Sequence, residues 1–268
     1  MTENKAVLAV SFGTSRPKTR RRTVEAVERD LAGAFPDRRF FRAWTSGMIR
    51  NKVRKEEGIS VLSPAEALDA MRRDGIDDVI VQPTMTVPGD EYDLVIKTVS
   101  QRAGMFAEVR MGKPLLSDED DIASAARAVE DAYGDIGDDS VLALMAHGSA
   151  GGDTAYGHLA ERFRSDGYGH FIIGTAENGP GFASILDTVR EKSPRRVVLA
   201  PLLLSAGMHA LRDMAGDGAD SWRSRLETEG YSVECRLTGL GELKAVRDIF
   251  ILHANKAVSF GSPKGDGV

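Results

Sequence analysis

Short apolar runs rich in β-branched residues alternate with longer amphipathic stretches along the chain, and this alternation restricts the fold more than any other feature. Each run has the length of one strand, and the stretches between them repeat apolar residues at three- and four-residue steps, as helices do. Alternating strands and helices form parallel sheets covered by helices, so the sequence predicts an α/β fold. The expected strands are residues 6–12, 38–44, 77–83, 106–112, 140–146, 170–175, 195–201 and 231–237.

The chain also contains an internal repeat. The segment VLAVSFGTS at 7–15 resembles VLALMAHGS at 141–149, with Gly13 matched to Gly148. Because glycine positions coincide as well as apolar ones, the likeness favours a duplication over a chance match of two strands.

A second pair of segments repeats in the same order. VIVQPTMTVPGDE at 79–91 resembles VVLAPLLLSAGMH at 197–209, with shared proline and glycine positions. Under this overlay Glu91 falls on His209. The two pairs together predict two similar half-domains.

The stretch GDIGDD at 134–139 is the expected boundary between these halves. We therefore predict an N-terminal α/β lobe at 1–134 and a C-terminal α/β lobe at 140–268, each with four parallel strands flanked by helices. Two similar lobes that face one another leave a cleft, and α/β proteins bind ligands where the carboxyl ends of their strands open. The active site is expected in that cleft.

Two of the five histidines stand where such proteins place reactive side chains. His147 and His209 each follow an apolar, strand-like run and have glycine beside or near them. His158 and His253 lie in helical stretches and His170 begins a strand, so a surface or capping role is the simpler interpretation for these three.

A carboxylate residue is the third candidate for this site, by the same argument. Glu177 follows the second strand of the C-terminal half, and strand-end loops of adjacent parallel strands meet at one edge of a sheet. Two imidazoles and one carboxylate leave coordination positions open, which suits a divalent metal that must react or move on. The single cysteine, Cys235, cannot supply a closed thiolate site.

Glu91 allows two interpretations. It follows the third strand of the N-terminal half, so it is a candidate catalytic carboxylate. It also stands at the start of a helical stretch, where an acidic residue stabilises the helix dipole with no further role. Basic clusters at 15–22 and 49–55 follow strand ends of the same half, and one or two of their side chains are expected to attract a polycarboxylate ligand.

Composition excludes other classes of function. The formal charge of −5 gives no basic face for nucleic acid, and the glycine-rich turn after His147 matches neither phosphate-binding loop motif. We expect neither a signal peptide nor a membrane span in the first residues, and one cysteine suits a reducing compartment. We expect a cytoplasmic protein that binds neither nucleic acid nor membrane.

Several motifs together resemble a known family, the anaerobic cobalt chelatases of CbiK type. They are VSFGTS, FFRAWTSGMI, PGDEY, AHGS, GTAENGPG and GMHALRDMAGDGADSW, and they cover nearly the whole chain in conserved order. The resemblance implies two chelatase-like α/β lobes around a tetrapyrrole cleft. It also implies that His147, Glu177 and His209 bind the incoming metal and that Glu91 belongs to the active site.

The family implies insertion of Co²⁺ into sirohydrochlorin, with release of two protons, in anaerobic cobalamin biosynthesis. Co²⁺ would then be a substrate, with no prosthetic group, and His147 is our candidate for the principal proton acceptor. The small residues Gly148 and Ser149 would let the flat macrocycle approach it. Relatives form dimers or larger assemblies, so a homo-oligomer is compatible with this sequence.

Two alternatives stay open. The same ligands accept Fe²⁺ or Ni²⁺, which would make the protein a ferrochelatase or nickel chelatase acting on sirohydrochlorin, as in sirohaem synthesis. A non-catalytic carrier of a tetrapyrrole or a metal would need the same binding groups.

Overall fold

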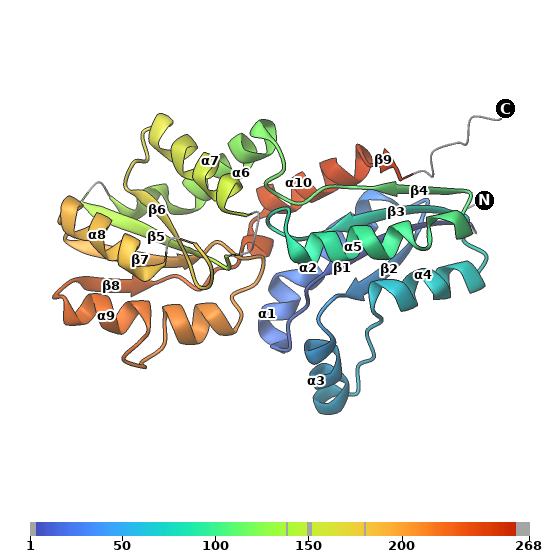
Figure 1. Ribbon diagram of the computed structural model, residues 1–268, viewed down its shortest axis with the longest axis horizontal. Coiled ribbons are helices and arrows are strands. Elements are labelled where there is room, and N and C mark those ends of the chain that lie inside the picture. Colours follow the sequence, from blue (N-terminus) through green and yellow to red (C-terminus); the bar gives the residue numbers. More distant parts are fainter. Residues whose placement is uncertain (1–3, 138, 149–151, 180, 261–268) are drawn as a thin grey trace. The chain divides into compact units, whose positions relative to one another are not determined.

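The chain folds into two compact α/β units. The computed structural model describes residues 4–137, 139–148, 152–179 and 181–260. Unit 1 comprises Met1–Leu115 and Arg247–Val268, and unit 2 comprises Leu116–Val246. Each unit is built on a single sheet with helices beside it (Figure 1). The α/β prediction is confirmed.

Unit 1 contains a five-stranded sheet in the order β2-β1-β3-β4-β9, in which the first four strands are parallel and β9 is antiparallel. Its strands are β1 (Lys5–Ser11), β2 (Arg39–Trp44), β3 (Asp78–Pro83), β4 (Glu108–Met111) and β9 (Val258–Ser259). Its helices are α1 (Pro17–Arg22), α2 (Val24–Ala34), α3 (Gly47–Glu57), α4 (Pro64–Arg73), α5 (Asp90–Ser100) and most of α10 (Lys244–Asn255), with a short 3₁₀ helix at Ala103–Met105.

The core of unit 1 follows from strand alternation. Leu8 and Val10 on β1 point to the same face of the sheet and pack in one cluster with Leu68 of α4 and Val95 of α5. These four side chains are at most 1% exposed, so burial of this apolar surface is what attaches both helices to the sheet.

Unit 2 contains a four-stranded, fully parallel sheet in the order β6-β5-β7-β8. Its strands are β5 (Ser140–Ala146), β6 (Phe171–Thr175), β7 (Arg196–Pro201) and β8 (Ser232–Cys235). Its helices are α6 (Glu119–Tyr133), α7 (Asp153–Ser165), α8 (Phe182–Lys192), α9 (Trp222–Thr228) and a π-helix at His209–Met214, with short 3₁₀ helices at Gly134–Ile136 and Leu240–Glu242.

The π-helix of unit 2 is held by the same core that holds α8 and α9. Ala210 and Met214 are fully buried in a cluster with Met145 of β5, Ile185 of α8 and Trp222 of α9. Short π-helical segments occur frequently at functional sites, and this one begins at a predicted site residue, His209.

All eight predicted strands are present, and the structure adds β9. The unit boundaries differ from the predicted lobes in two places. The C-terminal residues belong to unit 1, because Arg247 of α10 pairs with Asp30 of α2 at 2.7 Å and β9 pairs with β4. Helix α6 belongs to unit 2, where it packs against α7. The cleft expected between the lobes stays a prediction.

Among the described residues, no helix combines the length and the apolar character needed to cross a membrane.

Candidate metal centre

The three predicted metal ligands meet at the carboxyl edge of the unit 2 sheet. His147 directly follows β5, Glu177 lies two residues after β6, and His209 begins the π-helix after β7. Each offers one ligand atom, and these atoms all lie within 4.8 Å of one another. His147 and Glu177 are exposed and His209 is half-buried, so a small ion has access to the cluster.

The backbone fixes the first two ligands relative to one another. The amide of Glu177 donates to the carbonyl of His147 at 2.9 Å, and the amide of Ala176 donates to Ala146 at 2.9 Å. These bonds continue the parallel ladder of β5 and β6 beyond the strand ends. The positions of His147 and Glu177 therefore follow from the sheet.

Hydrogen bonds at Nδ1 set the tautomers of both imidazoles. Nδ1 of His147 lies 3.1 Å from the carbonyl oxygen of Gly148, and Nδ1 of His209 lies 2.7 Å from a carboxylate oxygen of Asp213. Both oxygens accept hydrogen bonds, so each Nδ1 carries a hydrogen, and in the neutral imidazole it is Nε2 that offers a lone pair to a metal. Nε2 of His209 lies 3.7 Å from Oε1 of Glu177. The rings of His147 and His209 meet edge to face, with centroids 5.0 Å apart.

Gly148 is required by this turn. Its φ is +83°, in the left-handed region, and an added Cβ would lie 2.2 Å from the carbonyl oxygen of Glu177. Any side chain here would push the Glu177 loop away from His147. Ser149, the other small residue expected behind His147, lies outside the described residues.

Asp213 is a site residue that the sequence interpretation missed. Its Oδ2 accepts the hydrogen bond from His209, and its Oδ1 lies 3.5 Å from Nε of Arg212. The spacing HALRD places His209 and Asp213 four residues apart, which brings their side chains together on one helix face. That spacing was the available signal.

Glu91 belongs to unit 1, in the first turn of α5. The helix begins after Gly89 and carries three acidic residues in that turn, as the helix-start interpretation predicts. Oε2 of Glu91 is nevertheless buried and has no hydrogen-bond partner among the described residues. Helix geometry explains the position of Glu91 but leaves this oxygen unused.

The remaining histidines lie outside the cluster. His158 is half exposed and lies 3.0 Å from Glu119, as a surface residue does. His253 differs from the expected surface or capping role: it is 2% exposed, and its Nδ1 lies 3.0 Å from the carbonyl oxygen of Lys113. It packs within unit 1, because α10 belongs to that unit.

The strand registers define which residues of the two units are equivalent. Val10 pairs with Pro83 in unit 1, and Met145 pairs with Pro201 in unit 2. Counting onward from Val10 and Met145, Gly13 corresponds to Gly148 as predicted, and both have positive φ. The letter-for-letter overlay of the two VLA strings is one residue out, since it would put Gly13 on His147.

Matched backbone hydrogen bonds extend this equivalence to the site. The hydrogen bond from the Ser46 amide to the Phe12 carbonyl, at 3.3 Å, corresponds to the hydrogen bond from the Glu177 amide to the His147 carbonyl. Phe12 is therefore the counterpart of His147, and Ser46 that of Glu177.

The third pair agrees with the sequence overlay. The hydrogen bond from the Asp93 amide to the Gly89 carbonyl, at the start of α5, corresponds to the hydrogen bond from the Leu211 amide to the Gly207 carbonyl, at the start of the π-helix. Glu91 is therefore the counterpart of His209, as the repeat predicted.

An α/β unit with an open cluster of two imidazoles and one carboxylate at its carboxyl edge has the groups that a metal-handling protein needs. Comparisons with known proteins give the family. The family described as cobalt chelatase (CbiK) matches residues 5–259. A sirohydrochlorin cobaltochelatase of Salmonella typhimurium is 36% identical over 261 residues, which cover 95% of this chain and 97% of that protein. The chain belongs to the CbiK cobalt chelatase family, and it is a metal chelatase.

Other relatives agree. The sirohydrochlorin cobaltochelatase CbiKC of Nitratidesulfovibrio vulgaris is 30% identical and covers 95% of this chain and 91% of that protein. Among solved structures, SirB from Bacillus subtilis with Fe³⁺ matches 94% of this chain and 95% of that chain with a TM-score of 0.65 at 14% identity. CbiX, from siroheme biosynthesis in denitrifying bacteria, covers 95% of this chain and 100% of that chain with a TM-score of 0.55 at 19% identity. At these identities the two structures support the fold alone.

Proposed function

We propose that this protein is a sirohydrochlorin cobaltochelatase: it inserts Co²⁺ into sirohydrochlorin and releases two protons, as a step of anaerobic cobalamin biosynthesis. The observation that carries the proposal is the cluster of His147, Glu177 and His209, whose ligand atoms lie within 4.8 Å of one another at an open sheet edge. Family membership supports the metal and the macrocycle. Co²⁺ is a substrate here, and no prosthetic group is needed.

The three cluster residues have different tasks in this proposal. Glu177 and His209 hold the incoming ion and hand it over, because a carboxylate and an imidazole suit Co²⁺ and leave coordination positions for the macrocycle. His147 also binds the ion through Nε2. When cobalt moves to the pyrrole nitrogens, this lone pair becomes free and accepts one of the two pyrrole protons, which then passes to water.

Glu91 is our candidate for the second proton acceptor. Its buried, unpartnered Oε2 supports this role beyond stabilisation of α5. Glu91→Gln keeps the side chain's size and removes the base. We expect a loss in insertion rate of about 10²-fold with little change in melting temperature. A normal rate with a lowered melting temperature would leave Glu91 with the helix role alone.

Asp213 acts as a positioning residue for His209. Its hydrogen bond at 2.7 Å holds the ring so that Nε2, rather than Nδ1, is the metal-binding nitrogen. Asp213→Ala is expected to weaken Co²⁺ binding about 10- to 100-fold, and Asp213→Asn, whose amide oxygen still accepts the bond, should recover part of it. Asp217→Asn is the matched control, because Asp217 is 94% exposed and pairs only with Arg223 among the described residues.

Titration of Co²⁺ into each variant, followed by its visible absorption, separates these outcomes. A positioning role predicts a weaker constant and altered bands for Asp213→Ala, with Asp217→Asn unchanged. Identical constants and bands in Asp213→Ala and the wild type would contradict it.

The function is tested by following the absorbance of sirohydrochlorin with Co²⁺, Fe²⁺ and Ni²⁺ in parallel at catalytic amounts of protein. The proposal predicts multiple turnovers, fastest with Co²⁺. Faster turnover with Fe²⁺ or Ni²⁺ would show that this metal, and not Co²⁺, is the preferred substrate. A spectral change that stops at one equivalent per protein would make the protein a carrier.

The proposal also covers location and assembly. We place the enzyme in the cytoplasm, since a chain with one cysteine, Cys235, suits a reducing compartment. A homo-oligomer is compatible with the reaction, and light scattering of the purified protein measures its size.

A further inference from the structure

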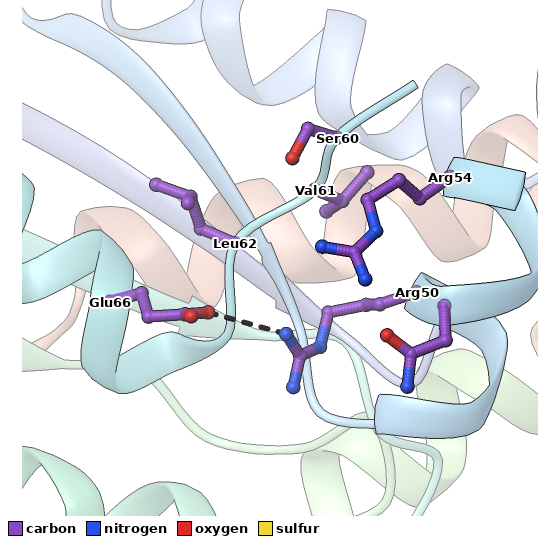
Figure 2. Close-up of a pocket in the computed structure, with 7 residues that line it drawn as sticks. Arg50, Arg54, Ser60, Val61, Leu62 and Glu66 are labelled. Carbon is purple, nitrogen blue, oxygen red and sulfur yellow. Dashed lines mark hydrogen bonds and ion pairs between the residues drawn. The ribbon is translucent and has the colours of Figure 1, made fainter. Parts of the chain in front are cut away.

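A small pocket of unit 1 lies between α3 and the segment that leads into α4. Its volume is about 70 Å³, and Arg50, Asn51, Arg54, Ser60, Leu62 and Glu66 are among the residues that line it. Arg50 and Arg54 are one helical turn apart on α3, and both guanidinium groups reach toward the facing segment (Figure 2). The space is suited to a group of a few atoms.

The two guanidinium groups have hydrogen-bond donors to spare. Nη1 of Arg50 donates to Glu66 at 3.2 Å, but Nε of Arg50 is buried without a partner. The Arg54 side chain forms no hydrogen bond or ion pair with any residue that the structure describes. A buried unsatisfied donor costs free energy, so an acceptor that entered the pocket would be stabilised.

The one carboxylate in the pocket does not use up this charge. Glu66 accepts hydrogen bonds of 2.7 Å from both the hydroxyl and the amide of Ser63. The bond from the Ser63 amide, together with the bond from the Glu66 amide to the Ser63 hydroxyl, forms the capping box of α4. The two bonds that the carboxylate accepts, the hydroxyl's above all, lower the pKa of Glu66. Two guanidinium groups face one engaged carboxylate, and the balance favours an anion.

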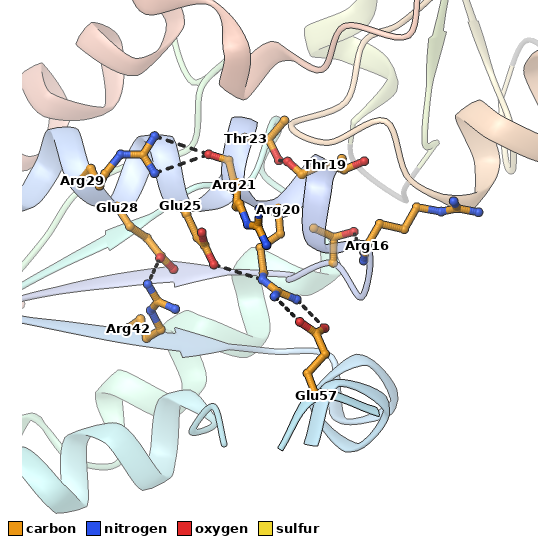
Figure 3. A network of polar contacts seen from close by, with 11 residues as sticks. Arg16, Thr19, Arg20, Arg21, Thr23, Glu25, Glu28, Arg29, Arg42 and Glu57 are labelled. Atoms are coloured by element: carbon orange, nitrogen blue, oxygen red, sulfur yellow. Dashed lines mark hydrogen bonds and ion pairs between the residues drawn. The ribbon is translucent and has the colours of Figure 1, made fainter. Parts of the chain in front are cut away.

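The backbone on both sides of the pocket is anchored to the rest of unit 1. Nη1 and Nη2 of Arg20 donate to Glu57 at the end of α3, at 2.9 and 2.6 Å, while Nε donates to Glu25 of α2 (Figure 3). On the other side, the amide of Trp44 at the end of β2 donates to the carbonyl of Leu62 at 2.9 Å. Backbone that is already held in place loses little entropy on binding.

These contacts give different roles to the two basic clusters that the sequence contains. Arg20, from the cluster at 15–22, is 4% exposed and fully engaged in an ion-pair network, so its task is structural. Arg50 and Arg54, from the cluster at 49–55, keep free donors in a pocket. Leu62 of the lining and Ile59, which precedes Ser60 in the chain, are 38% and 39% exposed, so apolar surface adjoins the charged groups.

We infer that this pocket binds a carboxylate side chain of the macrocyclic substrate, with Arg54 and Arg50 as the charged donors. A planar guanidinium matches a carboxylate bidentately, and adjoining apolar surface suits a ligand whose acid groups project from an apolar body. The inference rests on the proposed function, because that function supplies a polycarboxylate substrate.

The test is direct binding of metal-free sirohydrochlorin, followed by fluorescence titration in the intact protein. Arg54→Gln should weaken binding about tenfold, and Arg54→Lys, which keeps the charge but not the fork, should fall between it and the wild type. The matched control is Lys55→Gln, which removes one charge from the next residue of the same helix and lies outside the pocket lining. It should bind as the wild type does.

The methyl ester of sirohydrochlorin provides the second arm. Esters lack the carboxylate charge, so the wild type and Arg54→Gln should bind the ester equally. Equal binding of the free acid by both proteins would overturn the inference, as would an equal loss in Lys55→Gln or an equal loss for the ester. Failure of the wild type itself to bind sirohydrochlorin would instead sink the proposed function.

Discussion

The carboxyl edges of the two sheets have the same backbone and different chemistry. In unit 2 the strand-end positions carry His147, Glu177 and His209. The equivalent positions of unit 1 carry Phe12, Ser46 and Glu91. The backbone hydrogen bond between the first two of these positions is present in both units. It measures 2.9 Å from the Glu177 amide to the His147 carbonyl, and 3.3 Å from the Ser46 amide to the Phe12 carbonyl.

This difference separates what the fold supplies from what the side chains supply. Both units bring their strand-end loops together, because parallel strands end at one edge. Only unit 2 places two imidazoles there among the described residues. A metal site of this kind therefore depends on side-chain identity at positions that the shared scaffold has already brought into contact.

Removal of either histidine should have the largest effect. We expect His147→Ala and His209→Ala each to lower the rate of cobalt insertion about 10³-fold, because each variant lacks one metal ligand. The His147→Ala variant also lacks one of the two proposed proton acceptors. Insertion is followed by the absorbance of sirohydrochlorin. Near-normal rates in both variants would show that unit 2 does not hold the reaction.

The two equivalent glycines should differ in their tolerance of alanine. Gly148→Ala places a Cβ 2.2 Å from a backbone oxygen of Glu177, whereas Gly13→Ala places it 2.7 Å from the Trp44 ring. Both positions have positive φ. We expect a loss in unfolding free energy of about 3 kcal/mol for Gly148→Ala and a smaller loss for Gly13→Ala. Denaturant titration measures both, and the reverse order would contradict the comparison.

Exchange of counterparts tests the ligand carboxylate. Glu177→Ser gives unit 2 the residue that unit 1 has, and we expect Co²⁺ affinity to fall about 10²-fold. The reciprocal Ser46→Glu should create at most weak affinity in unit 1, because Phe12 offers no ligand atom and Glu91 would be the one other ligand among these positions. Calorimetric titration of Co²⁺ measures both variants. An unchanged affinity in Glu177→Ser would remove Glu177 from the ligand set.

A smaller effect is expected from pH, through a buried carboxyl group of unit 1. Glu28 of unit 1 is 2% exposed, and burial raises its pKa from 4.5 to about 7, although Arg42 at 2.6 Å opposes the shift. The folded state then binds the proton more tightly than the unfolded chain does. The contribution of Glu28 to stability is therefore fully present below about pH 4.5 and is lost as the pH rises to about 7.

Glu28→Gln removes this titration. We expect the difference in unfolding free energy between wild type and variant to change by on the order of 2 kcal/mol between pH 5 and pH 8, in favour of the variant at the higher pH. Denaturant unfolding across that range measures it. Parallel pH profiles of the two proteins would contradict a raised pKa.

The sequence predicted the strands and the candidate site because both depend on local patterns. Apolar runs of strand length marked all eight core strands, and strand-end positions marked His147, Glu177 and His209. The internal repeat predicted that Glu91 and His209 occupy equivalent positions in the two units, and the matched backbone hydrogen bonds agree with it.

The rest depends on contacts between distant segments, which no local pattern contains. β9 has only two residues and finds β4 across more than a hundred positions of the chain. The assignment of α10 to unit 1 rests on the pairing of Arg247 with Asp30. Asp213 needed the helix after β7 to be known before its spacing from His209 had meaning.

The most direct test is a crystal structure of the protein with Co²⁺, in which anomalous scattering locates the metal. The account predicts one strong cobalt peak, about 2.0 to 2.2 Å from Nε2 of His147, Nε2 of His209 and a carboxylate oxygen of Glu177. A peak coordinated by Glu91 of unit 1, with His147 and His209 unligated, would contradict it.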